Sequence, residues 1–105
     1  MSLSFATDRM AEMAAVLTQD EVTRRLAALA GWELEGKTIE KTFRFADFRE
    51  AMRFVNRVAD LAEVEDHHPD IFIHYREVTL TLWTHAAGGL TERDFKLAAD
   101  IDRVD

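Results

Sequence analysis

Apolar and polar residues follow a helical spacing in three stretches of the chain. These stretches begin after Thr18, after Asp47 and after Thr91, and each of these residues is a good N-cap with an acidic residue three positions later. The middle stretch is the clearest, because its apolar residues recur at i, i+3, i+4 and i+7. The members of this stripe are Phe48, Ala51, Met52, Val55, Val58, Ala59 and Ala62. Three helices are therefore predicted.

Between the predicted helices the spacing changes to two, which is typical of half-buried strands. Residues 32–45 alternate around a turn at 36–37, and residues 71–85 alternate around a turn at 76–77, so each stretch predicts a β-hairpin. Gly31 is expected to cap the C-terminus of the first helix. The order helix, strand, strand, helix, strand, strand, helix predicts an α+β fold: a four-stranded antiparallel sheet with the helices packed mainly on one face.

The length of 105 residues suits one domain. We expect a single domain over residues 17–105, preceded by an N-terminal arm over residues 1–16. The sequence has no run of roughly 20 apolar residues, so no membrane-spanning segment is predicted and a cytoplasmic location is expected.

The charge balance and the absence of cysteine narrow the function classes. Acidic residues outnumber basic residues by 20 to 13, giving a formal net charge of -7. Proteins that bind nucleic acids by neutralising phosphates carry the opposite sign, so nucleic-acid binding is disfavoured. Without cysteine the chain cannot form a disulfide framework, a thiolate zinc site or a cysteine nucleophile.

Three of the four histidines lie at the two ends of the second predicted hairpin. His67 and His68 precede it, and His85 ends it. Because a tight turn brings the outer ends of its two strands together, we expect these three side chains to be neighbours. Imidazoles exchange protons near neutral pH, which suits general acid–base catalysis, and Asp94 could join the cluster. His74 has no evident partner and is interpreted as a residue on the sheet face.

Each of these residues also has a plain structural interpretation. A single histidine at a strand end is more often a packing or surface residue, and Asp94 would serve as a helix N-terminal carboxylate. Glu63 would belong to a solvated, acidic helix end. Three histidines with carboxylates also match the ligand count of zinc or iron, but adjacent side chains in an extended segment diverge, so a metal site is the less favoured alternative.

Two motifs carry a family resemblance. The first is E-x-x-x-H-H-P, from Glu63 to Pro69, and the second is T-H-x-x-x-G-L-T-x-x-D, from Thr84 to Asp94. Together, at this separation, they resemble the pterin-4a-carbinolamine dehydratase family, also called 4a-hydroxytetrahydrobiopterin dehydratase, and the match runs from about Leu17 to the C-terminus. The resemblance implies an αββαββα fold, in agreement with the order of elements above.

The same resemblance implies an activity: removal of water from a 4a-hydroxytetrahydropterin to give the quinonoid dihydropterin, in tetrahydrobiopterin recycling. It implies that the pterin is the substrate and that neither a metal nor a bound organic cofactor is needed. The implied catalytic residues are His67, His68 and His85, supported by Glu63, Pro69 and Asp94.

Within this set we expect His67 and His85 to form the acid–base pair and His68 to hydrogen-bond the pterin. Asp94 would fix the tautomer of one histidine, as carboxylates do elsewhere. Two other functions stay open: a non-catalytic dimerisation or assembly cofactor of the same fold, and a metal-dependent hydrolase. The resemblance and the unpaired edges of a small sheet predict a homodimer or a homotetramer.

Overall fold

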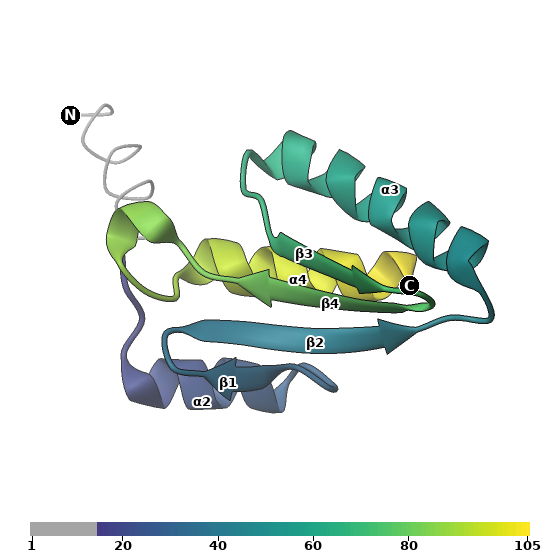
Figure 1. Cartoon of the computed structure of the whole chain (residues 1–105). Coiled ribbons are helices and arrows are strands. Elements are labelled where there is room, and N and C mark those ends of the chain that lie inside the picture. The colour runs from purple at the N-terminus through teal and green to yellow at the C-terminus, as the bar shows by residue number, and fades with distance from the viewer. Residues whose placement is uncertain (1–14) are drawn as a thin grey trace.

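The computed structural model describes residues 15–105, and the predicted arm over residues 1–16 lies almost entirely outside this part. The elements follow in the predicted order, with one short 3-10 helix added: α2 (Gln19–Ala27), β1 (Glu33–Glu35), β2 (Thr38–Arg44), α3 (Phe48–Glu65), β3 (Asp70–His74), β4 (Glu77–Leu82), η1 (His85–Ala87) and α4 (Glu92–Val104). The four strands form one antiparallel sheet in the order β1-β2-β4-β3, and α4 runs along the back of it (Figure 1). The α+β fold is confirmed.

All three predicted N-caps are present. The hydroxyl of Thr18 accepts from the backbone N–H of Glu21 at 3.2 Å, and the carboxylate of Asp47 accepts from that of Glu50 at 2.8 Å. Thr91 caps α4 in the same manner. These bonds satisfy amide groups that have no partner within the helix, which is why the helices begin at these residues. Within residues 15–105, no helix is both long and apolar enough to cross a membrane.

One face of the sheet carries the core, and the other face is open. Val78, Leu80 and Leu82 alternate along β4 and are fully buried, while the threonines between them are only half-buried. Ile39 and Phe43 of β2 stand opposite Leu82 and Val78 and are buried on the same side. The helices cover this side with the buried residues Val22, Ala51, Phe54, Val58, Ala62, Phe95, Leu97, Ala98 and Ile101. The helices therefore pack mainly on one face, as predicted.

The face of α3 that packs on the sheet differs from the predicted stripe. That stripe places Phe48 and Ala59 inside, and this is wrong, because both are exposed. Phe54, which lies outside the predicted stripe, is 2% exposed and packs against Phe43 with ring centroids 4.7 Å apart. The buried positions 51, 54, 58 and 62 form one narrow line, because only the residues nearest the sheet are covered.

The turn of the second hairpin comes one residue earlier than predicted. It consists of Tyr75 and Arg76, so Glu77 opens β4 and pairs with His74. Tyr75 adopts the left-handed backbone, with φ of 55°. That conformation is usually adopted by glycine, asparagine or aspartate. Because Tyr75 is none of these, the sequence did not indicate the position of the turn.

Gly31 does not cap the first helix, contrary to the prediction. Helix α2 ends at Ala27, and Gly31 instead makes the turn into β1 with φ of 84°. A side chain at this position would also meet Lys41, since an added Cβ would lie 3.0 Å from the end of that side chain. The left-handed backbone is the main reason for glycine here, and a Cβ would in addition make the Lys41 side chain shift.

A partly buried cation ties the C-terminal helix to the sheet. Lys41 lies on the helix-facing side of β2, where its ammonium donates to Asp102 Oδ1 at 2.9 Å and to the carbonyl of Ala30 at 2.8 Å. The indole Nε1 of Trp32 donates to the same carboxylate at 3.1 Å. The side chains of Lys41 and Asp102 are only 19% and 25% exposed, so removing one leaves the other poorly solvated.

Replacing Asp102 with alanine should lower the free energy of unfolding by roughly 1–3 kcal/mol, because Lys41 and the indole of Trp32 lose their acceptor. The matched control is Arg53→Ala, which removes an exposed ion pair with Glu50 and should cost less than about 0.5 kcal/mol. Urea unfolding followed by circular dichroism measures both. Equal losses in the two variants would contradict the role given to Asp102.

Candidate active site

Two segments meet at one end of the sheet and form a pocket. Asp70, the first residue of β3, pairs with Thr81 near the end of β4, so the residues before β3 lie beside the residues after β4. The pocket between them has a volume of about 260 Å³ and is lined by Asp66, His67, His68, Trp83, Thr84, His85, Ala86 and Arg93. The predicted convergence of the three histidines is confirmed; their individual roles stay predictions.

His67 and Asp94 form the buried part of this site. The Nε2 atom of His67 lies 2.5 Å from Asp94 Oδ1, and the two residues are 8% and 0% exposed. The other carboxylate oxygen, Oδ2, accepts from the hydroxyl of Thr84 and from the backbone N–H of Thr91, each at 2.9 Å. Asp94 therefore receives hydrogen bonds at both oxygens and holds the imidazole of His67 in one orientation.

His67 points inward because of the backbone conformation at the end of α3. Asp66 closes the helix in the left-handed conformation, with φ of 49°, which an aspartate tolerates better than most residues. The guanidinium of Arg93 donates to the carbonyls of Asp66 at 2.6 Å and of Glu65 at 3.2 Å, so the helix end is fixed to the start of α4. Lys96 also bonds the Glu65 side chain, and this contact raises the pKa of the lysine amine.

The other two histidines are exposed to solvent. Nε2 of His68 lies 2.6 Å from Glu63 Oε2, in a surface pair whose side chains are 57% and 76% exposed. His85 packs its ring against Trp83, with centroids 3.9 Å apart and planes at 51°. The site thus combines one buried imidazole, fixed by a carboxylate, with two imidazoles that a ligand from solvent can reach.

The three supporting residues do not line the pocket itself. Asp94 lies behind His67, Glu63 contacts His68 from the outside, and Pro69 is half-buried next to the pocket residues in sequence. Each of the three is linked to the pocket by a histidine: Asp94 and Glu63 contact one, and Pro69 follows one in the sequence. Their effect on a ligand would therefore be indirect.

Sequence reasoning did not name five of the lining residues as site residues: Asp66, Trp83, Thr84, Ala86 and Arg93. A signal was present for Thr84, because the buried positions 78, 80 and 82 alternate along β4 and the same parity places residue 84 inside. A polar side chain at a buried position of this alternation needs a hydrogen-bond partner, and such a partner indicates a functional site nearby. Arg93, in the first turn of an amphipathic helix, gave no such signal.

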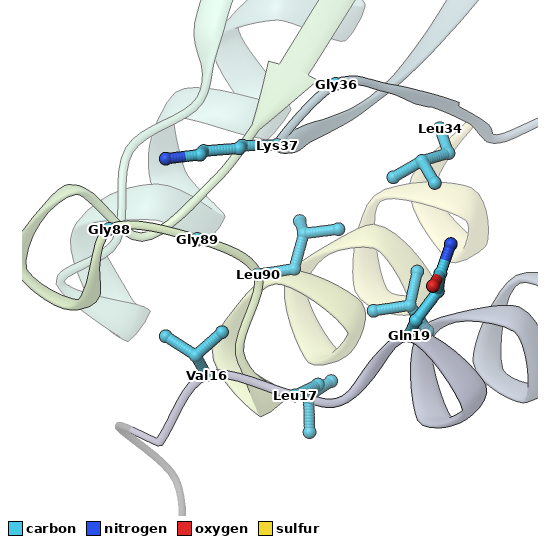
Figure 2. A pocket seen from close by; sticks show the side chains of 10 residues that line it. Val16, Leu17, Gln19, Leu34, Gly36, Lys37, Gly88, Gly89 and Leu90 are labelled. Atoms are coloured by element: carbon cyan, nitrogen blue, oxygen red, sulfur yellow. The ribbon is translucent and has the colours of Figure 1, made fainter.

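Within residues 15–105 no group of three or more His, Asp or Glu side chains is arranged to hold a metal ion. A second pocket among the described residues, of about 310 Å³, is bordered by Gly88 and Gly89, directly after η1, and has a different character (Figure 2). Its lining is largely apolar, with the side chains of Val16 and Leu90 directed into it, and Lys37 is its one ionisable side chain. Of these two pockets, only the first is lined by histidines.

The fold and this pocket define a small α+β protein of αββαββα order with three histidines around one cavity. The family model described as pterin 4 alpha carbinolamine dehydratase matches residues 15–104. The chain belongs to the pterin-4a-carbinolamine dehydratase family.

Close relatives cover nearly the whole described chain. A protein of Roseiflexus castenholzii is 53% identical over 92 residues, covering 88% of this chain and 99% of the relative. A protein of Acidobacterium capsulatum is 53% identical over 90 residues, with 86% and 98% covered. Both are named "Putative pterin-4-alpha-carbinolamine dehydratase".

Two solved structures share the fold. A transcriptional coactivator/pterin dehydratase from Brucella melitensis superimposes with a TM-score of 0.81 at 40% identity, covering 85% of this chain and 97% of that chain. A pterin dehydratase-like protein, identified as a RuBisCO assembly factor in the alpha-carboxysome, gives 0.61 at 27% identity, covering 70% and 88%. The names of these two proteins, which share the fold, thus describe different functions.

His67 should contribute to stability as well as to the site. His67→Ala leaves Asp94 Oδ1 buried without its donor, so the free energy of unfolding should fall by about 1–3 kcal/mol. His85→Ala, at an exposed position of the same pocket, is the control and should change it by less than about 0.5 kcal/mol. Denaturant unfolding of both variants measures the difference; an unchanged midpoint for His67→Ala would show that the contact with Asp94 is not formed.

Proposed function

We propose that this protein is a 4a-hydroxytetrahydrobiopterin dehydratase that works by histidine general acid–base catalysis. The observation that carries the proposal is the pocket in which His67, His68 and His85 meet, within a chain that belongs to the dehydratase family. Tetrahydrobiopterin recycling in the cytoplasm is the setting proposed for this reaction.

The reaction needs one proton donor and one proton acceptor. The bond between C4a and the hydroxyl oxygen breaks, and because hydroxide is a poor leaving group, an acid protonates that oxygen so that it departs as water. A base removes the hydrogen from N5, and the C4a–N5 double bond of the quinonoid dihydropterin forms. Imidazoles suit both tasks, because they give and take protons near neutral pH.

His67 is the proposed base and His85 the proposed acid. When the Nε2–H of His67 donates to Asp94, Nδ1 carries a lone pair that can accept the proton from N5. The carboxylate beside the ring then stabilises the imidazolium that forms. His85 lies in the same pocket, is exposed to solvent and can be reprotonated there after each turnover.

His68 is proposed to orient the pterin rather than to transfer a proton. Glu63 accepts a hydrogen bond from this imidazole, which leaves its other ring nitrogen for the substrate. The flat ring of Trp83 lines the same pocket and offers a surface against which a planar pterin can stack.

A second candidate is a non-catalytic assembly role. It is favoured by the structural likeness to the protein identified as a RuBisCO assembly factor, with a TM-score of 0.61. In that case the histidines would be dispensable, and the protein would act through its surface. Turnover of enzymatically generated 4a-hydroxytetrahydropterin by the purified protein decides between the two candidates, and metal analysis of the same sample tests the metal-dependent hydrolase.

Substitution of the pocket histidines should reduce turnover by the amount typical of an acid or a base, ~10²–10⁴-fold in kcat. His67→Gln is preferred to alanine, because its amide can still donate to Asp94 and preserve the fold. His85→Ala should give a loss of similar size. His68→Ala should raise KM more than it lowers kcat, because its role is binding.

His74 supplies the internal control. It lies on β3 with the same residue type but outside the pocket, so His74→Ala should keep near-normal kcat and KM. Steady-state kinetics of the four variants, with folding checked by circular dichroism, gives the answer. Full activity in both His67→Gln and His85→Ala would refute the acid–base assignment.

We propose in addition that the protein is a homodimer or a homotetramer. β3 is an edge strand of the sheet, and Ile71 and Phe72 on it are 38% and 64% exposed. Exposed apolar side chains on an edge strand favour pairing with a second chain. Light scattering at micromolar concentration should give two or four times the chain mass of 12.0 kDa; a single species of 12.0 kDa would exclude the oligomer.

A further inference from the structure

Two buried threonines, Thr84 and Thr91, have their hydroxyls at the histidine pocket or next to it. Thr84 follows β4 and is 5% exposed, and Thr91 caps α4 and is fully buried. Their hydroxyl oxygens are 2.8 Å apart, and the Thr84 oxygen is also 2.9 Å from Asp94 Oδ2. Thr91 Oγ1 in turn accepts from the backbone N–H of Arg93 at 3.2 Å.

Counting the available hydrogens fixes the direction of every hydrogen bond in this network of Thr84, Thr91 and Asp94. A carboxylate only accepts, so the single hydroxyl hydrogen of Thr84 must be given to Asp94. Thr84 then has no hydrogen left for Thr91, and the hydroxyl of Thr91 must donate to Thr84. Asp94 thus accepts at Oδ2 from Thr84 and from the Thr91 backbone, and Oδ1 is left for His67.

We propose that Thr84 is a positioning residue that fixes the tautomer of His67 through Asp94. The two donors at Oδ2 hold the carboxylate of Asp94 with Oδ1 directed at His67. A carboxylate oxygen only accepts, so in this orientation the ring hydrogen of His67 stays on Nε2 and the lone pair stays on Nδ1. This places the acceptor nitrogen on the side away from Asp94. The effect on turnover rests on the proposed dehydratase function, whereas the tautomer itself does not.

A purely structural role for Thr84 would be to fill space and satisfy a buried hydroxyl. The strand before Thr84 offers a comparison: Thr79 of β4 and Thr42 of β2 share a hydroxyl–hydroxyl contact of 2.8 Å, but on the open face of the sheet and with no carboxylate beyond it. Only the Thr84 contact leads on to an ionisable side chain that contacts a pocket histidine.

The test is to replace Thr84 with valine, which has the same shape but no hydroxyl, and with serine, which keeps the hydroxyl. Long-range ¹H–¹⁵N correlation spectra of the histidine rings report which nitrogen of His67 carries the hydrogen. Steady-state kinetics with 4a-hydroxytetrahydropterin report kcat and KM. Thr79→Val, on the preceding strand β4, is the matched control.

We expect Thr84→Val to show a mixture of His67 tautomers and a kcat lower by roughly 10- to 100-fold, the size expected when one charge-assisted hydrogen bond is lost. Its KM should change much less. Thr84→Ser and Thr79→Val should keep the single Nε2–H tautomer of His67 and near-normal kcat. If Thr84→Val does not fold, Thr84→Ala, which also lacks the hydroxyl but has no methyl groups near the carboxylate, should give the same mixture of tautomers.

Two results would overturn the proposal. One is an unchanged His67 spectrum in the hydroxyl-free variants, and the other is a serine variant as impaired as the valine variant, which would show that shape alone matters. If the wild-type protein itself lacked dehydratase activity, the proposed function would fail, but the ring spectra would still decide whether Thr84 controls the tautomer.

Discussion

The hydrogen bonds of one buried carboxylate, that of Asp94, hold together three separate parts of the chain. Through its backbone partner Thr91 it closes the first turn of α4, through Thr84 it fixes the segment after β4, and through His67 it fixes the link between α3 and β3. A fully buried carboxylate is costly unless each oxygen receives hydrogen bonds, so these three segments are stable only when they are assembled together. The pocket is formed by the same three segments, and its shape depends on this constraint.

The pocket residues therefore differ in how much each contributes to stability and to the proposed chemistry. His67 is part of the buried network and is proposed to contribute to both, whereas His68 and His85 are exposed and contribute little to the fold. Adjacent residues reach these different environments because Asp66 reverses the backbone and Arg93 fixes the helix end, so that His67 turns inward and His68 outward. The protein thus holds one rigid imidazole beside two accessible ones within a short stretch of chain.

The sequence predicted the features that local chemistry specifies. The three N-caps, both hairpins and the meeting of the histidines follow from capping residues, alternation and the closeness of hairpin ends. The missed features depend on tertiary packing: the burial of Phe54 in place of Phe48, and the left-handed turn at Tyr75. The contact of His67 with Asp94 was not predictable as a pair, because nothing local says which histidine faces inward.

The double use of Asp94 affects how related sequences should be interpreted. Because this residue completes the capping box of α4, a descendant that abandoned catalysis would still lose stability by replacing it. The exposed His68 and His85 carry no such structural requirement, so under the proposed function only the chemistry would conserve them. We therefore expect the aspartate to persist wherever this helix start is kept. Under the proposed dehydratase function, the two exposed histidines would be the residues whose identity separates an enzyme from a protein that has kept only the fold.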